Sequence, residues 1–104
     1  MNMINPQECQ ATFCANVCDV LAFVGISKRS LADRIGIYPM KMTRLLNLER
    51  PMVYAEALNI AAALKIPIDK LADRRLTAED LPQVTKKLVQ QEKKAAREAK
   101  DDRQ

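Results

Sequence analysis

The sequence contains no histidine and only two glycines, and both shortages limit the chemistry open to this protein. Histidine is the most common general base near neutral pH, so its absence removes the usual route to acid–base catalysis. Two glycines are too few for the glycine-rich loop that holds the phosphates of a nucleotide. No other catalytic constellation is visible, and we therefore predict that the protein is not an enzyme and needs no cofactor.

Cysteine is scarce as well, with Cys9, Cys14 and Cys18 as the three in the chain. An odd number of cysteines without an export signal argues against a disulfide framework. Cys14 and Cys18 would share a helix face, but no histidine or second cysteine group is present to complete four metal ligands. We expect free cysteines that behave as small, commonly buried hydrophobic residues, and no bound metal.

Long hydrophobic runs are also missing from the chain. No stretch of about 18 apolar residues occurs, so no segment is expected to span a membrane. The N-terminal sequence MNMINPQECQ has neither the basic region nor the hydrophobic stretch of a secretion signal. These absences predict a cytoplasmic location without a membrane partner. The 104 residues are enough for one small hydrophobic core.

The apolar residues that are present recur every three or four positions and rarely alternate, which predicts an all-α protein. Asn5 and Ser27 are suited to capping the amino ends of two helices, and Gly25 to ending the first of them. Pro39 suits the first position of a third helix. The expected helices cover residues 6–24, 28–35, 39–47 and 52–65, followed by a single turn over residues 68–71.

The fourth expected helix and the C-terminal part have distinct apolar sides. The fourth helix should bury a stripe made of Ala57, Leu58, Ala61 and Leu64. Another helix is expected to begin within residues 77–80, with the start moved to Asp80 by Pro82, and its apolar side would consist of Leu81, Val84, Leu88 and Val89. Residues 90–104 contain no large apolar side chain and nearly balanced charges, which favours a solvated, frayed helix.

The stretch SLADRIGIYPMKMTRLL, residues 30–46, begins as an amphipathic helix, breaks at Gly36 and then resumes. Two short helices joined by a tight turn containing glycine form a helix-turn-helix, whose second helix enters the DNA major groove. Ala32 supplies the small residue where the helices cross, Gly36 tolerates positive φ, and Met42 faces inward. The spacing therefore predicts this motif over residues 28–47.

From Gly25 to Leu71 the sequence resembles the lambda-repressor/Cro-like (XRE-type) class of helix-turn-helix regulators, which are typical of phages and prophages. The matching features are Leu-Ala-x3-Gly at residues 31–36 and Ala-x2-Leu-x-aliphatic at residues 61–66. The chain departs from the common pattern at Lys28, Pro39, Leu46 and Leu48. The resemblance implies a compact five-helix DNA-binding domain over residues 1–75, with a charged C-terminal helix or tail over residues 76–104.

Positive charge is concentrated in the expected motif. Residues 27–50 contain six cations and two anions, which gives them the same net charge of +4 as the whole chain. A cluster of this kind favours binding to phosphates, driven by the release of counterions. The partner predicted by both the motif and its charge is a double-stranded DNA operator.

Individual roles follow from the inward positions of Met42 and Leu45, which leave the opposite helix face for the groove. Arg44 suits guanine and Asn47 suits adenine, while Thr43 or Met40 could meet a thymine methyl. Lys28 and Arg29, near a helix amino end, and Arg50 suit backbone phosphates. The predicted DNA-binding residues are Lys28, Arg29, Tyr38, Met40, Lys41, Thr43, Arg44, Asn47 and Arg50.

These features predict a transcriptional regulator. The favoured interpretation is a Cro-type repressor of a phage or prophage. A lone motif contacts too little DNA for tight binding, so a homodimer on a palindromic operator is expected. The apolar side of residues 81–89 is the first candidate for the dimer contact, with the first and fourth helices as others. Two alternatives stay open: a small phage activator acting beside RNA polymerase, and an antitoxin-like or adaptor protein that binds through residues 76–104.

Overall fold

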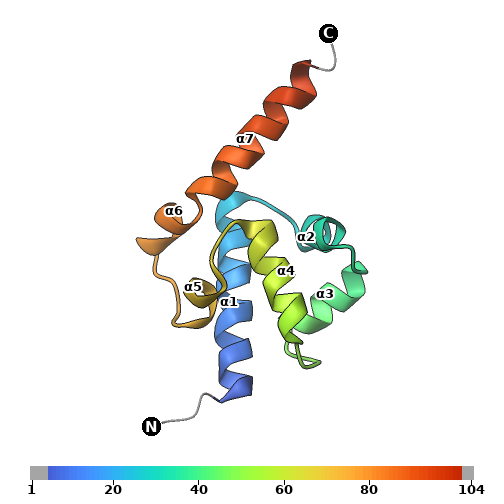
Figure 1. Ribbon diagram of the computed structural model, residues 1–104, viewed down its shortest axis with the longest axis vertical. Helices are drawn as coiled ribbons and strands as arrows, with labels where there is room; N and C mark the ends of the chain where they lie inside the picture. The colour runs from blue at the N-terminus through green and yellow to red at the C-terminus, as the bar shows by residue number, and fades with distance from the viewer. Residues whose placement is uncertain (1–4, 102–104) are drawn as a thin grey trace.

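The computed structural model describes residues 5–101 of the chain, with side chains as far as residue 95. Within this range the protein consists of seven helices and no strand, which confirms the prediction of an all-α class. Figure 1 shows α2 to α6 around the long first helix, α1, and α7 leaving the body at one end. The helices are α1 (Pro6–Val24), α2 (Lys28–Ile35), α3 (Pro39–Leu46), α4 (Tyr54–Leu64), α5 (Ile68–Ala72), α6 (Asp80–Val84) and α7 (Lys86–Asp101).

Helix α1 begins and ends as its cap residues predict. The side chain of Asn5 accepts hydrogen bonds from the backbone amides of Gln7 and Glu8, at 2.9 and 3.3 Å. Gly25 adopts the left-handed conformation with φ of 86°, and its amide donates to the carbonyl of Leu21 at 2.8 Å. This ending turns the chain sharply, so that α2 runs at 109° to α1.

Helix α2 matches its expected bounds, and α3 starts as expected but ends one residue earlier. The Ser27 hydroxyl accepts from the amide of Ser30 at 3.0 Å, which caps the amino end of α2. Gly36 ends α2 with φ of 75°, a conformation that a side chain would strain. Helix α3 starts at Pro39 and ends at Leu46, so that Asn47 is its cap and not its last residue.

The fourth helix differs from its prediction in start and in register. It begins at Tyr54 and not at residue 52, because the chain is still extended at Val53, with φ of −82° and ψ of 156°. The prediction that Leu58 is buried is wrong, since this side chain is 39% exposed, while Ile60 is fully buried. Two residues correspond to a rotation of about 200° in a helix, which places Leu58 opposite Ile60.

The C-terminal region forms two helices where the sequence predicted one. Helix α6 starts at Asp80, as Pro82 suggested, and stops at Thr85 before α7 begins. Thr85 lies at the break between the two helices and is buried. Its hydroxyl donates to the carbonyl of Leu81 at 2.6 Å, so this polar group is hydrogen-bonded although it is shielded from water. Helix α7 continues to Asp101, which confirms a helix for this part of the tail; residues 102–104 lie outside the described range.

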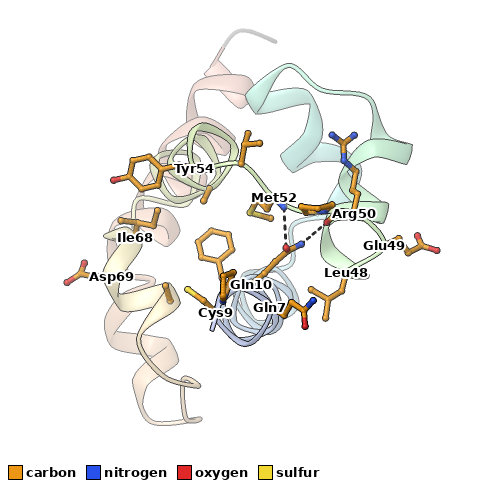
Figure 2. A pocket seen from close by; sticks show the side chains of 16 residues that line it. Gln7, Cys9, Gln10, Leu48, Glu49, Arg50, Met52, Tyr54, Ile68 and Asp69 are labelled. Carbon is orange, nitrogen blue, oxygen red and sulfur yellow. Dashed lines mark hydrogen bonds between the residues drawn. The ribbon is translucent and has the colours of Figure 1, made fainter. Parts of the chain in front are cut away.

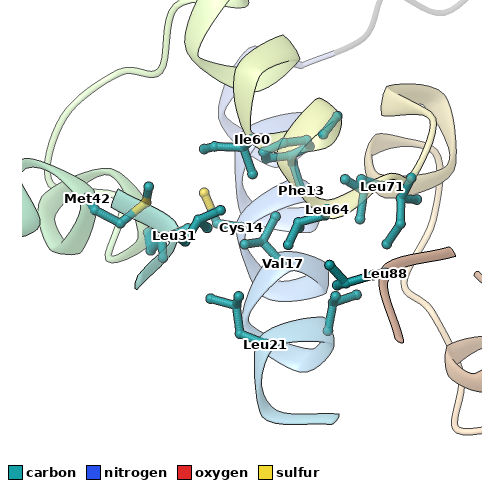
Figure 3. Packing of buried hydrophobic residues seen from close by; sticks show 14 of the residues in the cluster. Phe13, Cys14, Val17, Leu21, Leu31, Met42, Ile60, Leu64, Leu71 and Leu88 are labelled. Carbon is teal, nitrogen blue, oxygen red and sulfur yellow. The ribbon is translucent and has the colours of Figure 1, made fainter. Parts of the chain in front are cut away.

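One hydrophobic core joins all parts of the body (Figure 3). It contains side chains from α1 to α5, and Leu88 of α7 is fully buried in it as well. Leu81 and Val84 pack against the same core. The apolar side of residues 81–89, the first candidate for a dimer contact, is therefore largely covered by the chain's own body.

Asn16 of α1 fixes the connection between α5 and α6. Its side-chain nitrogen donates to the carbonyls of Leu71 and Arg74, at 2.7 and 2.8 Å. Its oxygen accepts from the Leu76 amide at 2.9 Å and from the Arg75 guanidinium at 3.0 Å. All the hydrogen-bonding capacity of this buried amide is used within the protein, so the connection is held firmly to α1.

The cysteines are free, as predicted. Cys14 is buried, and burial together with the neighbouring Cys18 raises the pKa of its thiol to about 11. Among residues 5–101 no group of three or more possible metal ligands is found. No single helix in this range is long and apolar enough to cross a membrane. Helices α1 and α2 reach that length and hydropathy only when taken together, and the chain bends by 109° between them.

Candidate nucleic-acid interface

Helix α3 has one buried and one exposed side. Met42 and Leu45 are fully buried, as the sequence predicts. Tyr38 is 83% exposed and Met40 66% exposed, so both side chains are available to an external partner. The exposed residues of the predicted site on and around this helix are Tyr38, Met40, Thr43, Arg44 and Asn47. Five of the nine predicted residues are therefore exposed on α3 or at its two caps.

Thr43 is partly committed within its own helix. Its hydroxyl donates to the carbonyl of Pro39 at 3.1 Å, one turn earlier. The hydroxyl hydrogen is thus already used, and a contact with a base would depend on the oxygen or the methyl group. Arg44 has no ion-pair partner among the described side chains, so its guanidinium can meet an external acceptor.

Lys41 differs from the other predicted residues because it is paired within the protein. Its ammonium lies 3.3 Å from Oε2 of Glu56 in α4, and its side chain is only partly exposed. Glu56 is 9% exposed, and its other oxygen accepts from the Val53 amide at 3.0 Å. Burial opposes ionisation of Glu56, but the Val53 amide and Lys41 outweigh it and lower the pKa of this carboxyl. Lys41 therefore joins α3 to α4.

Three further cations of the predicted site are exposed. Lys28 and Arg29 occupy the first turn of α2 and are exposed. Arg50 is exposed in the connection between α3 and α4. None of the three has an ion-pair partner among the side chains that the structure describes. Together with Arg44 they make four such cations around α2 and α3.

Gln10 positions the connection that carries Arg50, and sequence reasoning missed it. Its side-chain nitrogen donates to the Arg50 carbonyl at 2.9 Å, and its oxygen accepts from the Met52 amide at 3.2 Å (Figure 2). The same nitrogen lies 3.4 Å from the carbonyl of Leu45, the last but one residue of α3. A glutamine on α1 thereby replaces the hydrogen bonds that the irregular connection cannot make itself.

Arg34, near the carboxyl end of α2, is also paired, and its partner was not foreseen. Its guanidinium lies 2.6 Å from the carboxylate of Glu92 in α7. This ion pair ties the projecting helix to α2. The charge of Arg34 is therefore balanced by Glu92 within the protein, and the charge of Lys41 is balanced by Glu56 in the same way. These two of the six cations in residues 27–50 have partners inside the protein.

A separate apolar groove lies beside this surface. It has a volume of about 980 Å³ and is formed by the amino half of α1, the connection between α3 and α4, and parts of α4 and α5 (Figure 2). Phe13, Met52 and Tyr54 are among its apolar walls. Neither α2 nor α3 contributes to it within its helical bounds, so the groove and the exposed side of α3 are distinct surfaces.

A comparison of this chain with protein families, with curated proteins and with solved structures found no match. Arguments about function therefore rest on the residues and on the geometry described above.

Proposed function

We propose that the protein is a sequence-specific DNA-binding transcriptional regulator of the lambda-repressor/Cro type. One observation carries the proposal: two eight-residue helices, α2 and α3, meet at a tight turn with Gly36 in the left-handed conformation. In the helix-turn-helix this arrangement presents the second helix to the major groove. The exposed side of α3 would then read the bases, with Arg44 as the residue best suited to guanine.

The charges around this surface support DNA as the partner. Lys28, Arg29 and Arg50 surround α3 and would hold the phosphates on either side of the groove. Lys41 and Arg34 are paired within the protein, so we assign them structural roles and not phosphate contacts. Tyr38 and Met40 would supply contacts of shape and apolar surface, since neither can make the paired hydrogen bonds of arginine or asparagine.

The proposed form of the regulator is a homodimer on a palindromic operator, acting as a repressor. With the apolar side of α6 and α7 largely used in the core, the dimer contact would lie elsewhere. The outer side of α4 is the best candidate, because Tyr54 is 70% exposed and Leu58, four residues later, is also exposed. Residues four apart lie on the same side of a helix, so these two form a continuous apolar strip.

Selection from random duplex DNA tests this proposal. The purified protein should enrich one sequence with two symmetric half-sites about one helical turn apart. A gel shift with that sequence should weaken steeply between about 50 and about 200 mM salt. Enrichment of no sequence by the folded protein would overturn the proposal. A footprint that overlaps a promoter would support repression, whereas one just upstream would favour an activator.

A further inference from the structure

Helix α7 has an inward side that two contacts define. Leu88 is fully buried in the core, and Glu92, four residues later, pairs with Arg34 of α2 at 2.6 Å. Residues four apart share one side of a helix, so this side faces the body. Figure 1 shows the rest of α7 projecting beyond the other helices. The projecting helix therefore has a determined orientation about its own axis.

The lysines of α7 lie away from that inward side. A helix turns about 100° per residue, so Lys86 and Lys93, seven residues apart, lie within about 20° of each other. Leu88 is about 200° from Lys86 by the same count, on the opposite side. Lys87 and Lys94 repeat this spacing, and all four lysines are exposed. The same spacing of seven places a lysine at position 100 and an aspartate at position 101.

The charge of these lysines is not neutralised by acidic neighbours on the described part of the helix. Glu92 is the one acidic residue between positions 86 and 95, and its partner is Arg34. None of the four lysines forms an ion pair with any side chain described in the structure. The helix thus adds four cations without a described partner to the four that surround α2 and α3.

The chemistry of α7 favours phosphates over a membrane or a helical protein partner. Residues 90–104 contain no large apolar side chain. A helix that lies on a bilayer needs bulky apolar residues opposite its cations, and a helix that binds in a protein groove needs apolar anchors. A row of lysines on one side instead matches the regularly spaced charges of a nucleic-acid backbone.

We propose that the lysine side of α7 is a second DNA contact, which binds backbone phosphates and reads no bases. The choice of duplex DNA as the partner rests on the function proposed above, but the contact needs no particular base sequence. Buried Leu88 and the Arg34–Glu92 pair keep the opposite side of α7 against the body, so the lysines stay on its outer side. Sixteen helical residues span about 24 Å, which is long enough to reach several phosphates.

The test is the triple variant Lys86→Gln, Lys93→Gln and Lys94→Gln, which changes exposed side chains only. Its affinity is measured across a range of salt concentrations on two duplexes, the selected sequence and a scrambled one. Each lost phosphate contact lowers the slope of log K against log salt by about 0.9, so we expect a slope lower by about 2 to 3. Affinity should fall by a similar factor on both duplexes, with the preference between them unchanged.

The matched control is the double variant Lys65→Gln and Lys70→Gln, which removes exposed lysines from the body at α4 and α5. This variant should keep the wild-type slope. If the triple variant also keeps the wild-type slope and affinity on both duplexes, the inference is wrong. Binding to vesicles containing phosphatidylserine is measured for the same proteins. If the triple variant binds these vesicles more weakly than the wild type but binds both duplexes as the wild type does, α7 contacts a membrane surface and the inference is wrong.

The two proposals can fail separately in this experiment. A wild-type protein that binds both duplexes equally would contradict the proposed function. A loss of affinity in the triple variant on the scrambled duplex would support the contact through α7 even then.

Discussion

The ammonium of Lys41 in α3 lies 3.3 Å from the carboxylate of Glu56 in α4. Glu56 also accepts a hydrogen bond from the amide of Val53, the residue just before its own helix. One nearly buried carboxylate therefore caps α4 and holds the exposed helix of the candidate interface in place. The same lysine is one of the residues that the sequence pattern predicts to contact DNA.

The Lys41–Glu56 pair predicts a specific dependence of stability on pH. Glu56→Gln keeps an acceptor for Val53 but removes the charge, so it should lower the free energy of unfolding near neutral pH by about 1–2 kcal/mol. Because the pKa of Glu56 is lowered on folding, its contribution to stability is present above the ordinary carboxyl pKa of 4.5 and is lost as pH falls through the lower pKa of the folded state. Urea denaturation at several pH values should show the variant and the wild type converging in acid. A constant difference across that range would contradict this role of the charge.

Lys41→Met tests the other partner of the pair. It leaves Glu56 nearly buried without its cation, which should cost about 1–3 kcal/mol of stability. The slope of DNA affinity against salt should stay at the wild-type value, because this ammonium is not assigned to a phosphate. Lys28→Met is the matched control: it should leave stability unchanged and reduce the slope by about 0.9. If Lys41→Met instead reduced the salt slope and left stability unchanged, Lys41 would be a phosphate contact.

Asn16 is predicted to be the most sensitive polar residue of the body. Asn16→Leu removes four hydrogen bonds and leaves buried backbone groups of the α5–α6 connection without partners. We expect a loss of about 2–4 kcal/mol in the free energy of unfolding, measured by chemical denaturation. Asn59→Leu, on the exposed side of α4, should change it by no more than about 0.5 kcal/mol. Equal effects of the two substitutions would contradict the role given to Asn16.

Lys65 offers a stabilising substitution. It ends α4 in the left-handed conformation with φ of 59°, which glycine adopts without strain. Lys65→Gly should therefore raise the free energy of unfolding by about 0.5–1 kcal/mol, visible as a higher melting temperature. Lys70→Gly, inside α5, should lower it by about 1 kcal/mol because glycine is a poor helix former. Destabilisation by both variants would show that the left-handed ending carries no strain.

The proposed dimer contact through α4 can be tested by a charge at its centre. Tyr54→Glu should shift the protein from dimer to monomer in sedimentation experiments, since it places a carboxylate in the exposed apolar strip with Leu58. Phe23→Glu, at an exposed apolar residue near the end of α1, should leave the oligomeric state unchanged. A Tyr54→Glu protein that is still a dimer would place the contact elsewhere.

Helix ends were predictable from the sequence because the signals for them are local. Asn5, Ser27, Gly25 and Gly36 act within one turn of their own positions, so the bounds of α1 and α2 follow from neighbouring residues. The side of α4 that is buried was not predictable in the same way. This helix is apolar on most sides, so the choice between Leu58 and Ile60 depends on where α1 and α2 pack.

The contacts that position the candidate interface join residues far apart in the chain. Gln10 bonds to Arg50 across 40 positions, and Arg34 pairs with Glu92 across 58. No short pattern signals such pairs, because each partner alone looks like an ordinary surface residue. The exposed residues of α3 were predictable, since they follow from the inward positions of Met42 and Leu45. The pairing of Lys41 with Glu56 was not predictable, because Glu56 lies on another helix.

The most direct test of DNA reading by α3 is to repeat the selection from random duplex DNA with Arg44→Ala. Arg44 is exposed, has no described partner, and is the residue assigned to guanine. The variant should lose preference at one base pair of each half-site, keep the other positions, and bind the wild-type sequence more weakly by about 1–3 kcal/mol. Lys70→Ala, an exposed cation on α5, should select the wild-type sequence. An Arg44→Ala protein that selects the same sequence with the same affinity would contradict the account.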